Sequence, residues 1–280
     1  HGRYSWLIMN TPGTTPTGPY PTPRIIAFAN IKGGVGKTTT TINLGACLAE
    51  QGYRVLIIDL DPQGNATSWL GAKDNHPATM YHVLTKETPL EDCLVSTATK
   101  NLFVVPSDLN LAGAEIELVS AYSRETRLKA AISQIIDQFD YVLIDCPPSV
   151  SLLTVNALTA ANEVIAPLQS HYSSLEGLKL LWQNILKVKE HLNPGLDITH
   201  IIITMFDART KHASEVESDI RENSEFGPKV CKTNIPHNVR LTEATSFGQP
   251  ITIFDSNSAG AKAYRAVALE VSGGAKNGTR

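Results

Sequence analysis

The sequence lacks the features that would assign it at once to a disulfide-rich, membrane-spanning or strongly basic class. Its four cysteines, Cys47, Cys93, Cys146 and Cys231, form no CxxC pair, so we expect reduced thiols in a cytosolic protein rather than disulfides or a metal site. No run approaches roughly 18 uninterrupted apolar residues, which argues against a membrane-spanning helix. A net charge of -3 gives no overall attraction to nucleic acid, so DNA binding would require a local patch or a dimer.

Low-complexity segments lie at the two ends of the chain. Proline, threonine and glycine dominate residues 10–23, and we expect residues 1–23 to form a disordered leader. This leader lacks the basic and apolar regions of a signal peptide, and Met9 is a candidate natural start, which would make residues 1–8 an addition. The glycine-rich residues 272–280 should be a flexible tail. One domain is therefore expected over residues 24–271.

Short β-branched runs alternate with helical patterns along this domain. That alternation predicts an α/β fold with a single doubly wound, mostly parallel sheet and helices on both faces. Strands are expected at residues 24–30, 54–59, 101–105, 140–145, 163–168 and 198–204. Helices are expected at residues 38–51, 108–120, 124–138, 151–160, 174–191, 211–224 and 258–271.

The most informative segment is the glycine-rich stretch at residues 31–39, between the first expected strand and the first expected helix. This layout, with Lys37 and Thr38 at the turn, is that of a phosphate-binding P-loop. Glycines let backbone N–H groups converge on a polyphosphate, and the helix N-terminus adds positive partial charge. The usual pattern places glycine six residues before Lys37, where Ile31 stands, and a second lysine, Lys32, follows it.

Acidic residues follow two of the other expected strands. Asp59 ends the strand at 54–59 and Asp61 follows it, while Asp145 ends the strand at 140–145. In an open parallel sheet the carboxyl ends of the strands form the edge where ligands bind. One carboxylate there is commonly a second site for Mg²⁺ through water, and another can orient an attacking water. Together with the loop, these residues predict a nucleotide-hydrolysing site.

Six segments in order along the chain resemble one family, the ParA partition ATPases with a deviant Walker A loop, in the wider group that includes MinD. The segments are 32–39, 59–65, 145–149, 153–158, 204–210 and 235–240. The resemblance covers roughly residues 24–271. It departs from the family pattern at Ser170, His171, His237 and Thr245. None of these four positions is expected to touch the phosphates.

The resemblance implies a role for each site residue. Lys32 would be the signature lysine that crosses a dimer interface to the partner's ATP, while Lys37 holds the β and γ oxygens in cis. Thr38 would ligate Mg²⁺, Asp145 would reach it through water, and Asp61 would position the attacking water. The remaining implied contacts are those of the phosphates with backbone N–H groups of Gly33, Gly34, Val35, Gly36, Lys37, Thr38 and Thr39, and of the adenine with Pro236 and Asn238.

The family also implies a function. We expect a cytoplasmic, nucleoid-associated ATPase that dimerises with ATP, binds DNA non-specifically and partitions a chromosome or plasmid. A ParB-like partner and DNA would stimulate hydrolysis, and no membrane is expected. Arg209 and Arg240 are the leading DNA-contact residues, with Lys262 and Arg265 second. Several carboxylates lie in the same stretch as Arg209 and Arg240, so an ordinary solvated helix face is an equally good interpretation of the charges alone.

Three alternatives stay open at this point. A MinD-like ATPase acting on a membrane would need a C-terminal amphipathic helix, for which residues 272–278 are a poor match. A metabolic enzyme built on this loop, such as a nitrogenase-reductase-like protein, would need cluster cysteines, and Cys146 is misplaced for that role. We interpret Cys146 as a packing residue. A cargo such as a protein organelle cannot be separated from a chromosome or plasmid by sequence.

Overall fold

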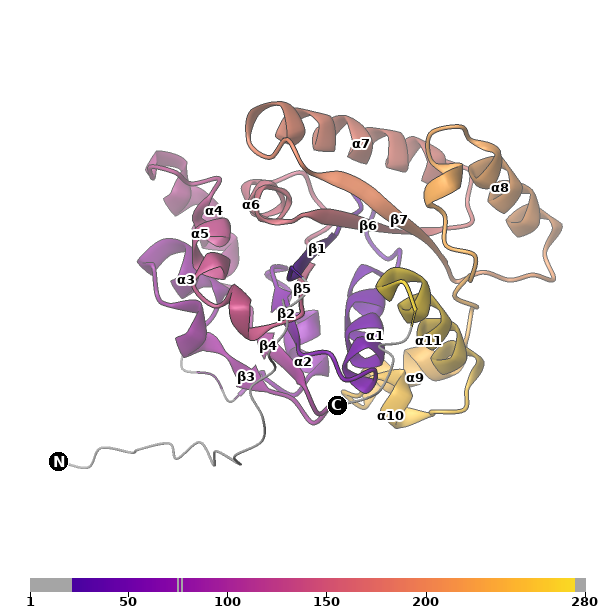
Figure 1. The fold of residues 1–280 in the computed structure, drawn as a ribbon, viewed down its shortest axis with the longest axis horizontal. Coiled ribbons are helices and arrows are strands. Elements are labelled where there is room, and N and C mark those ends of the chain that lie inside the picture. The colour runs from indigo at the N-terminus through magenta and orange to yellow at the C-terminus, as the bar shows by residue number, and fades with distance from the viewer. Residues whose placement is uncertain (1–21, 75, 77, 275–280) are drawn as a thin grey trace.

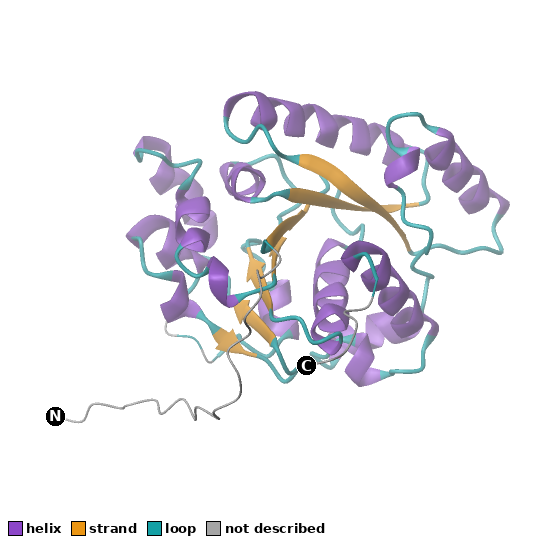
Figure 2. Cartoon of the chain, in the orientation of Figure 1, coloured by secondary structure: helices purple, strands orange, loops and turns teal. Residues whose placement is uncertain are grey.

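The computed structural model describes residues 22–74, 76 and 78–274, and its centre is a seven-stranded sheet (Figures 1 and 2). The strand order is β3-β4-β2-β5-β1-β6-β7, and only the edge pair β3–β4 is antiparallel. The strands are β1 (Arg24–Phe28), β2 (Val55–Asp59), β3 (Val95–Ser96), β4 (Leu102–Val105), β5 (Tyr141–Asp145), β6 (Glu163–Gln169) and β7 (Asp197–Thr204).

Helices cover both faces of the sheet. They are α1 (Lys37–Glu50), α2 (Asn65–Trp69), α3 (Met80–Lys86), α4 (Leu111–Glu117), α5 (Arg127–Ser133), α6 (Leu152–Ala160), α7 (Ser173–His191), α8 (Lys211–Glu222), α9 (Val239–Ser246), α10 (Ile251–Phe254) and α11 (Ala259–Ser272). Short 3₁₀ turns occupy Leu90–Cys93, Leu118–Ser120, Ile136–Gln138 and Gly227–Lys229. Figure 1 shows α1 and α11 side by side on one face, with α6 and α7 on the other.

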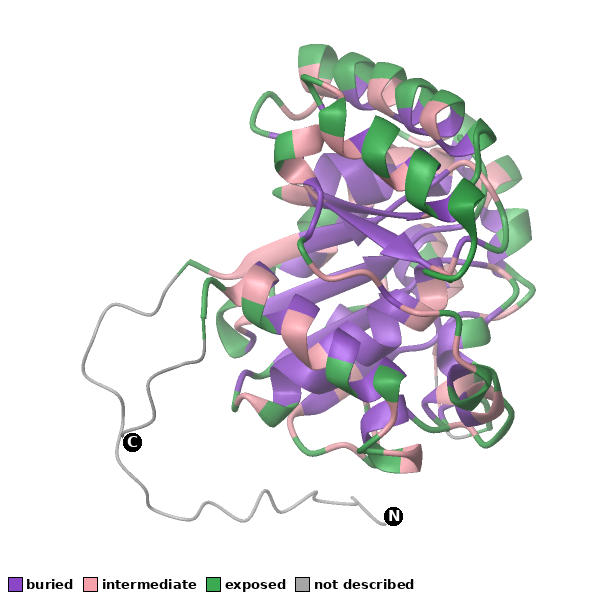
Figure 3. Cartoon of the chain, turned by 90° about the vertical axis from the view of Figure 1, so that its right-hand side faces the viewer, coloured by how far each residue is buried: buried purple, intermediate pink, exposed green. Residues whose placement is uncertain are grey.

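Two separate apolar cores explain this sandwich. Side chains alternate along each central strand, so Ala27 joins one core while its neighbours Ile26 and Phe28 join the other. The first core packs the sheet against α3 to α8, and the second packs it against α1, α2 and α9 to α11. Figure 3 shows the strands buried over most of their length, with exposed positions on the outer turns of the helices. The near-continuous apolar runs of the strands are therefore required by burial on both faces.

The fold class predicted from the sequence is confirmed, although several boundaries were wrong. The strand expected at 24–30 ends at Phe28, where the chain turns into the glycine-rich loop. The helix expected at 124–138 is α5 followed by a separate 3₁₀ turn, and the helix expected at 108–120 divides in the same way. The elements β3, α2, α3, α9 and α10 were not predicted, since they are two to eight residues long and carry little periodic signal.

The two predicted end segments fall mostly outside the described residues. Residues 1–21 of the expected leader and residues 275–280 of the expected tail lie outside them. The boundary of the last helix is one residue later than expected. Ser272 is still helical, and Gly273, with a φ of +74°, ends α11 in the left-handed conformation that favours glycine.

Candidate functional site

The carboxyl ends of three central strands meet at one edge of the sheet. The register pairs Asp145 at the end of β5 with Asp59 of β2 on one side and with Phe28 of β1 on the other. The loop from β1 to α1 therefore starts beside both acidic residues. This arrangement brings together the segments that the sequence singled out separately.

The conformation of this loop depends on its glycines. Gly34 and Gly36 have φ values of +73° and +84°, a region that other residues adopt only with strain. Gly36 directly precedes α1, and no side chain caps that helix. The loop is held from outside by Thr204, whose hydroxyl donates to the Val35 carbonyl at 2.8 Å, and by Gln169, whose amide donates to the Gly34 carbonyl at 3.1 Å. The uncapped N–H groups at the helix start suit an anion.

Lys37 lies inside the curve of the loop. Its Nζ donates to the Lys32 carbonyl at 3.0 Å, and only 7% of the residue is exposed. Burial lowers the pKa of Lys37, and the nearby negative charge of Asp145 partly opposes that shift. A buried cation whose main hydrogen bond is to a backbone carbonyl can exchange that carbonyl for a phosphate oxygen. The position therefore fits the predicted role in nucleotide binding.

Thr38 and Asp145 form the predicted metal pair. The Thr38 hydroxyl donates to Oδ2 of Asp145 at 2.7 Å, and the Thr41 hydroxyl donates to Oδ1 at 3.2 Å. Asp145 is fully buried, and this burial, together with the neighbouring Asp59 carboxylate, raises the pKa of Asp145. A hydroxyl beside a buried carboxylate offers oxygen ligands of the kind that Mg²⁺ prefers, so the residues fit this ion.

The segment after β2 is built around Asp59. Its carboxylate accepts hydrogen bonds from the Thr67 backbone N–H at 2.8 Å, the Thr67 hydroxyl at 2.6 Å and the Asp61 N–H at 3.2 Å. Asp61 is 8% exposed and accepts a bond from the Gln63 N–H at 2.9 Å. The sequence predicted a role for Asp61 but none for Asp59, which anchors the turn that carries it.

A pocket of about 240 Å³ opens next to the loop. The predicted adenine residues Pro236 and Asn238 both line it, as do Gly36 and Thr39 of the loop and α1. Sequence reasoning missed the other side chains, some of which are close neighbours of Pro236 and Asn238 while others come from distant segments. These are Trp69, Thr204, Met205, Ile235, His237, Leu241, Thr242, Thr245 and Tyr264. The size and the largely apolar lining suit a flat heterocycle.

Known proteins resemble the whole of this arrangement. A protein-family profile described as an AAA domain matches residues 23–198. The sporulation initiation inhibitor protein Soj of Bacillus subtilis is 49% identical over 249 residues, which are 89% of this chain and 98% of Soj. The chromosome partitioning protein ParA of Caulobacter vibrioides is 47% identical over 251 residues, 89% of this chain and 93% of ParA. This chain belongs to the ParA-type ATPases of the ParA/MinD family.

A solved structure is similar to this chain in fold and sequence. Cobyrinic acid a,c-diamide synthase from Mycobacterium smegmatis, crystallised with a bound ATP analog and magnesium, has a TM-score of 0.77 and 37% identity. The match covers 90% of this chain and 98% of that one. The family predicted from the sequence is thus confirmed, and the ligands of this relative are consistent with the predicted ATP and Mg²⁺. No helix in the described ranges is long and apolar enough to cross a membrane.

In this ParA-type chain the second lysine of the loop lies apart from the first. The Lys32 ammonium donates a hydrogen bond to the hydroxyl of Ser173, the first residue of α7. Its backbone N–H donates to Asn30 Oδ1 at 3.0 Å. Lys32 is half-buried, whereas Gly33 and Gly34 beside it are exposed.

The four DNA candidates lie on two helices, α9 and α11, and in the loop before α8. Arg209 pairs with Asp207 at 2.8 Å, and this arginine lowers the pKa of Asp207 to about 2. Arg240 pairs with Glu243 at 2.8 Å, and Arg265 pairs with Glu50 at 2.9 Å. Lys262 is exposed on α11 and forms no ion pair with any residue that the structure describes. The structure brings the nucleotide residues together, and Arg240 and Arg265 contact the adjacent residues Asp255 and Ser256 before α11.

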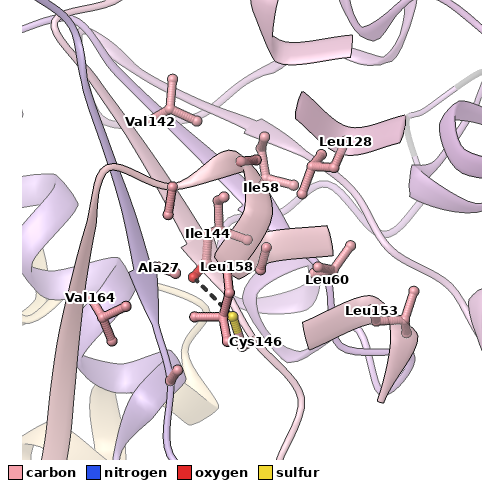
Figure 4. Packing of buried hydrophobic residues seen from close by; sticks show 14 of the residues in the cluster. Ala27, Ile58, Leu60, Leu128, Val142, Ile144, Cys146, Leu153, Leu158 and Val164 are labelled. Atoms are coloured by element: carbon pink, nitrogen blue, oxygen red, sulfur yellow. Dashed lines mark hydrogen bonds between the residues drawn. The ribbon is translucent and has the colours of Figure 1, made fainter. Parts of the chain in front are cut away.

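Cys146, next to Asp145, packs in the first apolar core. Figure 4 shows its sulfur beside Ile144, with Leu153 and Leu158 of α6 nearby. The thiol donates a weak hydrogen bond to the Ile144 carbonyl at 3.8 Å, and burial raises its pKa above the usual range. No group of three or more metal-ligating side chains occurs within residues 22–74, 76 and 78–274. These surroundings agree with the interpretation of Cys146 as a packing residue.

Proposed function

We propose that this chain is an ATPase that dimerises with ATP, binds DNA without sequence preference and partitions a chromosome or plasmid. The observation that carries the proposal is the loop with two lysines. Lys37 is buried inside the loop, while Lys32 extends away from it to α7. The names of Soj and ParA support a partition role. We place its action in the cytoplasm on the nucleoid.

Each residue of the site has one task in the proposed cycle. Lys37 and the backbone N–H groups of residues 33–39 bind the phosphates, and the base enters the pocket lined by Pro236 and Asn238. Thr38 and Asp145 would hold Mg²⁺, Asp145 through water, and the ion would neutralise charge on the phosphates. Asp61 orients the water whose oxygen attacks the γ-phosphorus, and ADP leaves.

Lys32 completes the site of a second copy. A cation added near the β–γ bridge stabilises the charge that develops during phosphoryl transfer. Two copies would then enclose two nucleotides, and each would supply Lys32 to the other. DNA and a ParB-like partner would stimulate ATP hydrolysis by the dimer, and hydrolysis would release the DNA.

A Lys32→Ala variant tests the shared site. We expect it to bind ATP as the wild type does, but to stay monomeric with ATP in sedimentation and to lose turnover by at least about 100-fold. The wild type with ADP is the matched monomeric control. A Lys32→Ala monomer that hydrolysed ATP at the normal rate would rule out the enclosed dimer.

The DNA proposal has a separate test. Binding to two unrelated DNA sequences is measured with ATP, with ADP and without nucleotide, at two salt concentrations. We expect binding only with ATP, equal for both sequences and weaker at high salt, because phosphate contacts release counterions. Sedimentation with liposomes is run in parallel. Binding to liposomes and not to DNA would favour a MinD-like membrane role instead.

A further inference from the structure

Lys32 is held at three points by its own chain. Its backbone N–H donates to Asn30, whose own amide donates to the Pro167 carbonyl of β6 at 2.8 Å. Its backbone carbonyl accepts the hydrogen bond from Lys37 Nζ at 3.0 Å. Its ammonium donates to the Ser173 hydroxyl. The loop thus fixes both the backbone and the side chain of the lysine that the proposed cycle must deliver elsewhere.

The packing of α7 leaves space for the Lys32 side chain to lie against its first turn. Gly177 lies one turn after Ser173, and a Cβ added to it would stand 3.9 Å from Lys32 Cδ and 3.9 Å from Asn30 Oδ1. The aliphatic part of Lys32 therefore lies directly over the first turn of α7. Because Gly177 has no side chain, it leaves room for Lys32 beside this turn of the helix.

The three hydrogen bonds that fix Lys32 differ in what would break them. When Lys37 exchanges the Lys32 carbonyl for a phosphate oxygen, nucleotide in the same copy removes one of these contacts. The hydrogen bond from the Lys32 backbone N–H to Asn30 Oδ1 involves neither ammonium group and can persist. The Ser173 bond cannot persist, since one ammonium cannot occupy its own α7 and the partner's phosphates together.

The contact of the Lys32 ammonium with Ser173 at the start of α7 is also a weak one for a cation. The N-terminal end of a helix carries positive partial charge, which opposes an ammonium, and Ser173 supplies only a neutral acceptor. A phosphate oxygen forms a charge-assisted bond that is roughly twice as strong. Ser173 can therefore hold Lys32 in the monomer, and a partner's nucleotide can then replace Ser173 as the acceptor.

We infer that Ser173 is a positioning residue that holds Lys32 against α7 in the monomer and so sets the ATP concentration needed for dimerisation. This inference rests on the proposed enclosed dimer. It adds a minimum ATP concentration for dimerisation. ATP in one copy first breaks the contact of Lys37 with the Lys32 carbonyl, and the ATP of a second copy then draws the Lys32 ammonium from Ser173.

The test uses two variants that act in opposite directions. Ser173→Ala removes the acceptor, and Ser173→Asp replaces it with a carboxylate that pairs with Lys32 and suits a helix N-terminus. Gly177→Ala is the matched control, because its methyl group would make only contacts of 3.9 to 4.0 Å. The wild type and the three variants are compared as full-length chains.

Two measurements are made on each protein. Acetylation of Lys32 by an amine-reactive ester is followed in the nucleotide-free chain by peptide mass spectrometry. We expect Ser173→Ala to react about threefold to tenfold faster than wild type and Ser173→Asp to react more slowly. The ATP concentration at half-dimerisation, measured by light scattering, should fall by a similar factor in Ser173→Ala and rise in Ser173→Asp.

The outcomes separate the inference from the proposed function. Equal labelling of Lys32 in wild type and Ser173→Ala would show that Ser173 does not hold Lys32 in solution, which overturns the inference. If labelling differs but the ATP concentration at half-dimerisation is the same in wild type and variants, the inference is also overturned, because the contact would not set that concentration. A wild type that never dimerises with ATP would overturn the proposed function itself, whatever the labelling shows.

Discussion

At the scale of single residues, Asp59 and Asp61 lie two positions apart and have different surroundings. Asp59 is fully buried and accepts three hydrogen bonds from its own loop. Asp61 uses Oδ1 to accept from the Gln63 N–H, and its Oδ2 has no hydrogen-bond partner in the part of the chain that the structure describes. That oxygen is available to a water. Asp59 therefore shapes the turn, and Asp61 is the better candidate for chemistry.

Asp61→Asn tests this role, because an amide oxygen can still accept the hydrogen bond from the Gln63 N–H while the negative charge is lost. We expect turnover to fall at least about 100-fold, since general-base or orienting groups commonly contribute this much. The ATP-bound dimer should persist. Phosphate release and sedimentation with ATP check both points, and a variant that hydrolysed ATP at the wild-type rate would contradict the role of Asp61.

The sequence predicted part of this site well and part of it not at all. Lys37 and Thr38 follow from a local motif, because a glycine-rich turn after a buried strand leaves few other roles for them, and Asp145 follows from its place at the end of a buried strand. Tyr264 and Trp69 reach the base pocket from the last helix and from α2, so no local spacing reveals them. Ser173 likewise meets Lys32 across 141 residues of chain. Tertiary placement, rather than residue type, assigns these side chains to the site.

At the scale of elements, strands β1 and β6 are joined by an ion pair. Arg24 donates to both carboxylate oxygens of Glu163, at 2.6 and 2.7 Å, and also to the Val271 carbonyl at the end of α11. Burial pushes the pKa of Glu163 upward, but the hydrogen bonds and charge of Arg24 outweigh burial and lower it. The ionised pair should therefore stabilise the fold above the unfolded-state pKa of glutamate and lose that contribution as the pH falls.

Glu163→Gln tests this dependence. Because one partner of a largely buried pair is left without its counter-charge, we expect the free energy of unfolding to fall by about 1–3 kcal/mol at pH 7. The difference from wild type should shrink as the pH falls below the ordinary glutamate pKa, because Glu163 is protonated first in the unfolded chain and at lower pH in the folded one. Urea unfolding at several pH values measures it. A difference that stays constant with pH would contradict this account.

The contact between α11 and α9 supports the base pocket through Gly260. A Cβ at this position would lie 2.8 Å from Leu241 Cγ, too close for any real contact, and Leu241 lines the pocket. Gly260→Ala should displace α9, lower the free energy of unfolding by about 1–3 kcal/mol and weaken ATP binding.

Gly113→Ala is the matched control, since a Cβ there meets nothing within 4 Å on α4. It should leave ATP binding unchanged and raise stability slightly, by about 0.5–1 kcal/mol, because alanine favours a helix over glycine. Calorimetry with ATP and thermal unfolding compare the two variants. Equal effects of both substitutions would remove the special role of Gly260.

The elements differ in how far the sequence predicts them. The buried strands are near-continuous apolar runs, so β1, β2 and β5 to β7 were predicted within two residues at each end. The two-residue β3 is defined only by its antiparallel pairing with β4, which no local pattern contains. The helices α9 and α10 pack on the second core through few side chains, so their periodicity is too short to recognise.

At the scale of the whole molecule, the net charge is -3 and most predicted DNA contacts are already neutralised by carboxylates. Arg209, Arg240 and Arg265 each pair with an acidic residue, and α11 offers Lys262 without such a partner among the described residues. Electrostatic attraction to DNA should therefore depend more on unpaired cations, doubled by dimerisation, than on the total number of basic residues.

Lys262→Ala makes this argument quantitative. If Lys262 contacts a phosphate, the slope of log affinity against log salt should decrease by about one for each contacting copy, with affinity lost equally on all sequences. Arg265→Ala should change the slope less, because the charge of this arginine is already neutralised by Glu50. Lys100→Ala, in the turn between β3 and β4, controls for the loss of one positive charge elsewhere. A slope that Lys262→Ala and Lys100→Ala change equally would mean that α11 does not face DNA, and the contact surface would then have to include the paired arginines.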